Sequence, residues 1–579
     1  ELHQREIAGD QFPYGLQLIM NAISPMVHGG DPVDVLDIEP VLATLREKIK
    51  DPDYVRNLVR RKLLDNPHRV TLTLRPDEQL ESHRQEAVER ALAERKAQLT
   101  EEETQQIVER AQALEERQLR KDDDSILPKV GLEDVPLQRP EPEGRYEADT
   151  GATVYTTGTN GLVYQQVVLP LPELTEEELL MLPYYATLIS EVGCGELDYL
   201  QMQDRISAES GGIGASLTAK GRIDDVQDLS GYLIFSGKAL ARNAKELTTL
   251  LKDVYTGARF DEKERIREII AQIRTRREQA VTGSGHALAM SAAAQGLSAG
   301  SWLAYRIGGL AAIKATKELD KALADEAGLS EFCGKLQALH ERVRNQKREF
   351  LLVGEEEQSQ PMLAELKACW QGEPAGGEGN WRMAPVNYST REAWLTSTQV
   401  NFCAKAYATV PVDHPDAAPL TVLGGFLRNG YLHRAIREKG GAYGGGAGQD
   451  SVTGVFRFFS YRDPRLGETL DDFDASLKWL QDEEHEPREL EEAILGVIGG
   501  LDKPRSPSGA ARHAYHDKLF GRTPEQRARF RERVLSVTVD DLRRVADTWL
   551  KPDNANVAVV TNPDNRSAAE QLGLSIQEL

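Results

Sequence analysis

Arg437 and Tyr443 are the residues of this 579-residue chain whose types and spacing best fit a chemical task. Arg437 falls near the end of an expected helix, and Tyr443 lies in the glycine run of residues 440–448. A guanidinium that is always charged and a phenolic hydroxyl are suitable donors to a carbonyl oxygen that becomes an oxyanion during hydrolysis. Chemistry alone leaves the alternative open that Arg437 forms a surface ion pair and Tyr443 packs on a sheet.

The glycine run itself does not indicate a nucleotide site. It lacks the GK[ST] ending of a phosphate loop, and it leads into a strand instead of opening a helix. A strand with so little side-chain bulk lets another backbone come close, so an extended peptide could add to its edge.

Two other motifs are weaker candidates. Residues 296–300 match the GxSxG of a nucleophile elbow around Ser298, but an alanine-rich helical segment precedes them where that elbow needs a strand, which indicates a loop between helices. His513 and His516 are spaced to share a metal ion on a helix, yet no third ligand is evident, so they are interpreted as surface or capping residues. The chain contains neither HExxH nor HxxEH.

The elements around these motifs form two similar blocks. Gly211-Gly212 recurs as Gly440-Gly441, and Phe235-Ser236 recurs as Phe459-Ser460. Such a long period predicts a duplicated α+β domain. The first block is expected to contain a strand at 162–169, helices at 176–192 and 199–207, a strand ending at 237 and a helix at 243–255. The second is expected to contain a strand at 400–409, helices at 415–427 and 431–438, a strand ending at 461, a helix at 469–480 and a last strand at 555–560.

A different organisation precedes the blocks. Residues 70–74 alternate as a strand would, and with the helix before them they look like the tail of a domain whose body lies upstream. Residues 77–124 are highly charged, and Thr100 with Glu103 forms a capping box, which predicts two helices meeting near Leu99. A Pro-rich segment at 128–142 follows.

Composition limits the class of protein. The chain has 70 Lys+Arg against 92 Asp+Glu, a net charge of −22, and 40% hydrophobic residues, which is typical of an acidic globular protein with several domains. This charge argues against nucleic acid or an anionic membrane as a partner. There is no apolar run of about 20 residues and no signal-like N-terminus. The four cysteines form no CxxC and indicate a reducing compartment, and because the chain begins at Glu1, we expect a processed or excised piece.

Residues 436–444 resemble the signature in the last domain of the pitrilysin (insulinase) family of zinc metallopeptidases. Other segments resemble the presequence protease branch of that family, in a consistent order along essentially the whole chain. They are residues 12–16 (Phe12-Pro13-Tyr14-Gly15-Leu16), Asp31-Pro32, residues 63–69, Pro76-Asp77 and Leu127-Pro128.

The resemblance implies an α+β fold of duplicated pitrilysin-type (LuxS/MPP-like) domains, each an antiparallel-rich sheet packed with helices, preceded by a helical hairpin. Two such halves close like a clam around an unfolded peptide in this family. The implied divisions are 1–75, the tail of the second domain; 76–125, the hairpin linker; 126–345, the non-catalytic third domain; and 346–579, the fourth domain with the Arg/Tyr motif.

The resemblance also implies what this chain contributes and what it lacks. In the family, zinc is bound by HxxEH and a distal Glu in the first domain, so zinc is expected in an upstream half and no metal in this chain. Arg437 and Tyr443 match the pair that holds the substrate carbonyl and stabilises the tetrahedral intermediate. Gly441, Ala442 and Gly444 are expected to permit close approach of the substrate.

We therefore interpret the chain as the half without zinc of a metalloendopeptidase that degrades short unfolded peptides, inactive until joined by the upstream half that carries HxxEH. An acidic interior would favour basic peptides. The alternative is a catalytically inactive binding or scaffold subunit of the same fold, and a serine hydrolase using Ser298 is a more distant one. The expected compartment is the bacterial cytoplasm, with the mitochondrial or plastid matrix as the alternative.

Overall fold

The computed structural model describes residues 1–7, 13–77, 79–119, 126, 128–373 and 376–579, which form two compact units. Unit 1 comprises Glu1–Asn21 and Gly131–Leu579, and unit 2 comprises Ala22–Val130. Phe12 and Leu127, which contribute to the sequence resemblance, and the end of the charged hairpin at residues 120–125 lie outside the described residues.

The charged hairpin of unit 2 consists of two helices, as predicted. The break occurs because Thr100 caps the second helix: its N–H donates to Glu103 Oε2 (2.9 Å), and the Glu103 N–H donates to Thr100 Oγ1 (3.2 Å). The helices between residues 14 and 119 are α2 (Tyr14–Val27), α3 (Pro32–Leu36), α4 (Glu39–Lys48), α5 (Tyr54–Val59), the π-helix η1 (Arg60–Leu64), α6 (Leu80–Gln98) and α7 (Glu101–Leu119).

The strand predicted at residues 70–74 is wrong. These residues take no regular secondary structure, and Val70, Leu72 and Leu74 are 89%, 79% and 87% exposed. A strand exists through its backbone hydrogen bonds to a neighbour, whereas an alternating pattern predicts only which side chains a neighbouring layer would cover. No partner for this segment is present among the described residues.

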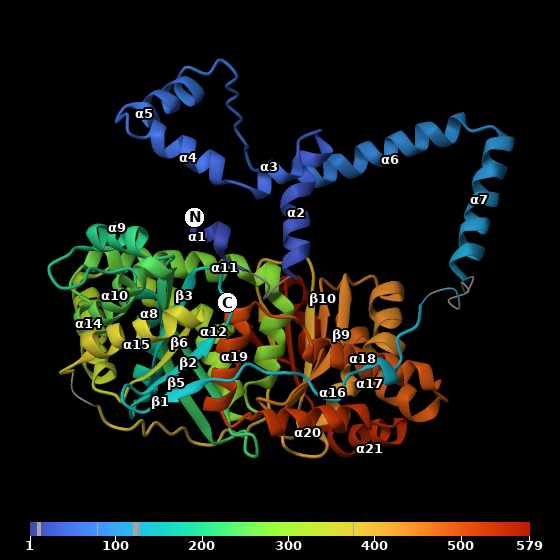
Figure 1. Ribbon diagram of the computed structural model, residues 1–579. Coiled ribbons are helices and arrows are strands. Elements are labelled where there is room, and N and C mark those ends of the chain that lie inside the picture. The colour runs from blue at the N-terminus through green and yellow to red at the C-terminus, as the bar shows by residue number, and fades with distance from the viewer. Residues whose placement is uncertain (8–12, 78, 120–125, 127, 374–375) are drawn as a thin grey trace. The chain divides into compact units, whose positions relative to one another are not determined.

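Unit 1 contains two six-stranded sheets with matching topology, in the orders β1-β2-β6-β3-β5-β4 and β12-β7-β11-β8-β10-β9. In both, a central parallel pair (β2 with β6, β7 with β11) is followed by three antiparallel pairings. The predicted duplicated α+β fold is therefore confirmed. We call the sheet β1–β6 with its helices the first repeat, and the sheet β7–β12 with its helices the second repeat (Figure 1).

The elements of the first repeat follow a short N-terminal helix, α1 (Leu2–Arg5), and the 3₁₀ turn η3 (Leu132–Asp134). They are β1 (Arg145–Glu147), β2 (Ala152–Thr156), β3 (Leu162–Pro170), α8 (Glu176–Leu188), α9 (Tyr199–Glu209), β4 (Ile213–Gly221), β5 (Leu229–Leu240), η4 (Ala241–Asn243), α10 (Ala244–Gly257), α11 (Lys263–Ala294), α12 (Ala299–Gly308), α13 (Leu310–Ala322), α14 (Glu326–Arg344), β6 (Glu349–Gly354) and α15 (Glu356–Trp370).

The second repeat has the same core elements with more helices at its C-terminal end. They are β7 (Arg391–Leu395), β8 (Phe402–Ala408), α16 (Ala417–Leu427), the π-helix η5 (Arg428–Lys439), β9 (Gly444–Asp450), β10 (Val455–Tyr461), α17 (Gly467–Asp482), α18 (Pro487–Leu501), α19 (Pro507–Leu519), α20 (Pro524–Leu535), α21 (Val539–Trp549), η6 (Pro552–Asn554), β11 (Asn556–Thr561), η7 (Pro563–Asn565), α22 (Arg566–Gln571) and β12 (Ser575–Glu578).

The expected boundary between residues 345 and 346 needs correction. It would assign β6 and α15 to the second repeat, but β6 lies between β2 and β3 in the first sheet. The chain passes from one repeat to the other between Trp370 and Arg391. The Pro-rich segment also crosses the expected division, because Arg531 of α20 donates to the Pro136 carbonyl (2.7 Å) before the chain enters β1. The other expected domain limits remain a proposal.

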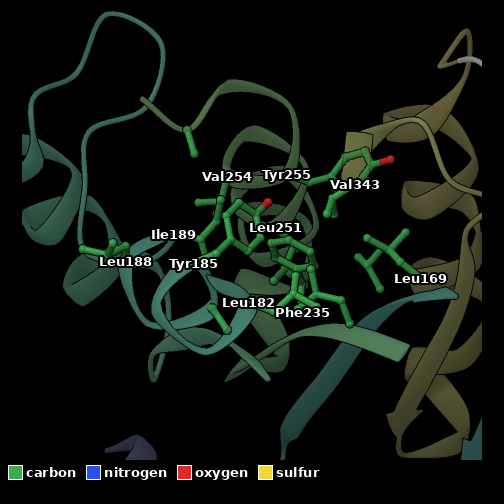
Figure 2. Packing of buried hydrophobic residues seen from close by; sticks show 14 of the residues in the cluster. Leu169, Leu182, Tyr185, Leu188, Ile189, Phe235, Leu251, Val254, Tyr255 and Val343 are labelled. Carbon is green, nitrogen blue, oxygen red and sulfur yellow. The ribbon is translucent and has the colours of Figure 1, made fainter. Parts of the chain in front are cut away.

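The core of the first repeat is formed where α8 and α10 pack on one face of its sheet. Figure 2 shows Tyr185 of α8 and Tyr255 of α10 among aliphatic side chains, with Phe235 of β5 beneath them. Each of these three rings is at most 1% exposed. Burial on this scale stabilises by about 25 cal/mol per Å² of apolar surface, which makes this layer a rigid base for the helices above it.

Each repeat also covers the other's sheet with one helix. α11 leaves the first repeat and packs on β8, β10 and β11, where its alanine-rich second half buries Leu288 and Ala292 against Phe402. α19 leaves the second repeat and packs on β6, where Tyr515 is buried. The exchange closes both cores, so the two repeats stabilise each other.

None of the helices in the described ranges is long and apolar enough to cross a membrane. The thiols of all four cysteines are free.

Candidate functional site

The backbone that carries the candidate site is a continuation of α16 into the π-helix η5. The sequence predicted a break before Tyr431 at Gly430, but the helix runs through it. Gly430 serves close packing instead, because a Cβ there would lie 2.2 Å from Trp479 Cη2. π-Helices are rare and occur frequently at functional sites, since their wider turn redirects side chains.

Two glycines end η5 and turn the chain toward β9. Gly441 has φ = +80°, and its N–H donates to the Arg437 carbonyl (3.1 Å), while the Ala442 N–H donates to the Ile436 carbonyl (3.1 Å). A residue with positive φ after a helix is usually glycine, because a Cβ there is strained. This turn places residue 443 next to the end of the helix.

The turn brings Arg437 and Tyr443 together on the surface. The guanidinium carbon of Arg437 lies 5.7 Å from the centroid of the Tyr443 ring, within range of a cation–π interaction. Arg437 is exposed, and Tyr443 is 66% exposed. Six residues apart in sequence, the two donors therefore face the same solvent region.

Tyr461, at the end of β10, positions Tyr443, and the sequence analysis did not single it out. The Tyr443 N–H donates to the Tyr461 carbonyl (3.1 Å) and to the Arg462 carbonyl (3.3 Å). The two tyrosine rings meet edge to face, with centroids 5.7 Å apart and an interplanar angle of 82°. Only the tertiary pairing of β9 with β10 brings them together, and the nearest sequence signal was the recurrent Phe-Ser pair before Tyr461.

The three small residues expected to contact substrate have different surroundings. Gly441 is exposed and forms the turn, whereas Ala442 is 3% exposed, with its side chain in the core of the second repeat. Gly444 begins β9, and a Cβ built on it would meet no atom within 4 Å. Open space for a neighbouring backbone is therefore present at Gly444, while the Ala442 side chain faces inward.

β9 forms the edge of its sheet. It pairs with β10 from Gly444 to Asp450, and no other described strand borders it. An unpaired edge presents N–H and C=O groups to which an extended peptide can add. This edge begins one residue after Tyr443.

The local charge of this surface is basic, unlike the chain as a whole. η5 carries Arg428, Arg434, Arg437 and Lys439 against a single carboxylate, Glu438. The acidic interior expected from the net charge is therefore absent at this helix.

His286 of α11 brings the first repeat to the edge of the site. Its ring lies 4.8 Å from the Tyr461 ring, and burial lowers its pKa, so the imidazole is neutral at pH 7. Its Nδ1 is buried and has no hydrogen-bond partner in the described part of the chain. Sequence offered no link between His286 and a strand of the other repeat.

Ser298 is a structural residue, as the context of its motif predicted. It is fully buried in the loop between α11 and α12, and its Oγ accepts from the Ser301 N–H (3.2 Å) as the N-cap of α12. A nucleophile must reach substrate, so this geometry excludes Ser298 from that role.

His513 and His516 have separate partners instead of a shared one. His513 Nδ1 lies 3.0 Å from Asp517 Oδ2, and His516 Nε2 lies 2.7 Å from Gln166 Oε1 on β3. Burial lowers the pKa of His516 to about 4. No three His, Cys, Asp or Glu side chains within the described ranges gather closely enough to hold a metal ion, so these residues do not fit a zinc centre.

Two family descriptions match the chain. Residues 74–319 match the domain associated with subfamily C of the M16 peptidases, and residues 391–562 match "PreP C-terminal domain". The second match begins at β7 and contains the whole candidate site.

Curated relatives extend the similarity over nearly the whole chain. Mitochondrial presequence protease of Danio rerio is 29% identical over 587 residues, which cover 96% of this chain and 56% of that protein. Presequence protease 1, chloroplastic/mitochondrial, of Arabidopsis thaliana is 27% identical over 562 residues, which cover 94% of this chain and 51% of that protein. The chain thus spans about half the length of these relatives.

A solved structure agrees on the fold. The first half of the periplasmic protease PqqL from Escherichia coli aligns with a TM-score of 0.54 and 15% identity, covering 76% of this chain and 95% of that one. At this identity the likeness concerns the arrangement of the repeats alone.

Proposed function

The chain is a presequence protease-like C-terminal half of the peptidase M16 family, and from this premise we propose that it supplies the substrate-holding side of a zinc metalloendopeptidase that degrades short unfolded peptides. The observation that carries the proposal is the pairing of Arg437 with Tyr443 on one exposed surface. Both are donors, and both lie at the start of an open sheet edge.

The proposed roles follow from the chemistry of the two groups. The peptide adds along β9, and its scissile carbonyl oxygen accepts from the Arg437 guanidinium and the Tyr443 hydroxyl. These donors hold the carbonyl and stabilise the negative charge that develops on it. Gly441 and Gly444 leave room for the peptide backbone, and Ala442 anchors the turn in the core.

The upstream half is the proposed partner. It would bind the zinc ion through HxxEH, and the metal would activate the attacking water when bound. Two observations support this division: the chain spans about half of its relatives, and Val70, Leu72 and Leu74 expose an alternating apolar face. By this proposal residues 1–75 complete a domain of the upstream half, and the chain alone is inactive.

The proposed setting is a reducing compartment with no nucleic acid or membrane partner. Four free thiols and the net charge of −22 support this. We place the protein in the bacterial cytoplasm, with the matrix of mitochondria or plastids as the alternative.

The test is hydrolysis of a fluorogenic peptide of about 10 to 30 residues by the chain alone, and by the chain joined to its upstream half with and without a zinc chelator. Tyr443→Phe and Arg437→Gln are expected to lower kcat by about 10²-fold each. Arg434→Gln on the same helix and Tyr146→Phe on β1 are matched controls, because both residues are exposed and lie outside the pair.

The alternative, a binding or scaffold subunit of the same fold, predicts a different outcome. The joined protein would then remain inactive with zinc supplied, although it would still bind the peptide. Activity that is equal in Tyr443→Phe and Tyr146→Phe would contradict the residue roles while leaving a peptidase.

A further inference from the structure

Arg462, the residue after β10, has an unusual backbone conformation beside the Arg/Tyr pair. Its φ is +50°, and in the described part of the chain the only other non-glycine residue with positive φ is Asn160. Asparagine tolerates this left-handed region, whereas arginine adopts it at a cost of about 1 kcal/mol or more. Such outliers gather at functional sites.

The side chain of Arg462 completes a symmetrical arrangement. Its guanidinium carbon lies 5.4 Å from the Tyr461 ring centroid, as that of Arg437 lies 5.7 Å from the Tyr443 ring centroid. Because the two tyrosine rings meet edge to face, a guanidinium lies at each end of a tyrosine pair. The carbonyl of Arg462 also accepts from the Tyr443 N–H (3.3 Å), which fixes the two residues together.

The Arg462 guanidinium is exposed and engages no protein carboxylate among the described residues. Arg465, three residues on, is different: it pairs with Asp472 at 2.8 Å and is structural. A guanidinium that is held over a ring and has no acidic partner keeps its planar fork available for a carboxylate.

We propose that Arg462 determines specificity by binding a carboxylate of the bound peptide, next to the carbonyl that Arg437 and Tyr443 hold. This inference rests on the proposed function and deepens it. The carboxylate belongs either to an acidic side chain or to the peptide C-terminus, since both present the same pair of oxygens. The basic η5 helix favours such an anion, in contrast to the preference for basic peptides inferred from the net charge.

The test compares peptides on the protein joined to its upstream half. The peptides have about 15 residues and share one sequence. One set places a single Glu at successive positions, a second set carries Gln at the same positions, and a third has an amidated C-terminus. The key variant is Arg462→Gly, which relieves the positive φ and therefore keeps or raises the melting temperature.

Arg462→Gly is expected to raise KM about tenfold for one Glu position, or for every peptide with a free C-terminus, while kcat stays within about twofold. Loss of the effect in the Gln set identifies the side chain, and loss in the amidated set identifies the C-terminus. Arg462→Lys retains the charge without the fork and is expected to recover part of the affinity. Arg434→Gln on η5 is the control for a general loss of positive charge.

The outcomes separate the inference from the proposed function. If the parent protein hydrolyses the peptides and Arg462→Gly treats all of them alike, the inference is wrong and the proposed function stands. If the parent protein hydrolyses none, both fall. An equal rise of KM in Arg434→Gln and Arg462→Gly would also overturn the inference, because it would indicate a diffuse charge effect.

Discussion

Gly441 provides a test of how the backbone holds the candidate site. Gly441→Ala adds one methyl group whose nearest neighbour would be Pro464 Cγ at 3.6 Å, an ordinary contact. The cost therefore comes from φ = +80°, which an alanine adopts at a loss of about 1 to 2 kcal/mol. For a domain of this size that loss lowers the melting temperature by about 2 to 8 °C.

Gly372 supplies a matched control with the same strain and no link to the site. It follows α15 in the first repeat, its φ is +83°, and a Cβ there would meet nothing within 4 Å. Gly372→Ala is therefore expected to lose a similar melting temperature. Only Gly441→Ala should also lower peptide hydrolysis, by about tenfold or more, because a changed turn moves the Tyr443 hydroxyl.

The assay is scanning calorimetry with hydrolysis by the protein joined to its upstream half, measured well below both melting temperatures. Gly441→Asn should recover most of the stability and activity, since asparagine tolerates the left-handed region. The reasoning is refuted if Gly441→Ala melts like the parent protein. It is also refuted if Gly372→Ala loses activity to the same extent, because the loss would then reflect stability alone.

Three further substitutions or conditions test other parts of the structure. Ser298→Ala removes the N-cap that accepts from Ser301 and should cost about 1 kcal/mol in chemical denaturation while hydrolysis persists; lost activity in a folded variant would revive the serine hypothesis. Gly285→Ala places a Cβ 2.4 Å from the Phe402 ring, so about 1 to 3 kcal/mol should be lost, and an unchanged melting temperature would contradict the close packing of α11. Burial lowers the pKa of His340 from 6.5 to about 4, so the unfolded chain binds more protons between these values. The free energy of unfolding should therefore fall by about 3 kcal/mol as the pH falls through this window, and urea titrations near pH 7 and pH 4 that agree would argue against it.

Sequence patterns predicted elements best where the local signal and the tertiary surroundings agree. The apolar run predicted as a strand at 162–169 is β3, Leu162–Pro170, which is buried between β5 and β6. The short strand β6 was missed, although it is also apolar, because it lies between two helices and six residues give little periodicity. That omission produced the wrong boundary at 345.

The candidate site was predictable only in part, for a similar reason. Arg437 and Tyr443 belong to one contiguous motif, so their proximity could be expected from the helix, the glycine turn and the strand. Tyr461 and His286 reach them through strand pairing and through a helix exchanged between repeats. The positive φ of Arg462 has no local signal, since the residue type argues against it.

The exchange of α11 and α19 makes the site a property of both repeats. Phe402 of β8 contacts the Tyr461 ring at 5.8 Å, and the Gly285 position lets α11 lie against that same phenylalanine. His286, the next residue, contacts the other side of the cluster. The ring that positions Tyr443 is therefore held from the first repeat, so a second repeat produced alone would expose the face covered by α11 and lose that support. The two repeats consequently have to be expressed together for the role of Tyr443 to be measured.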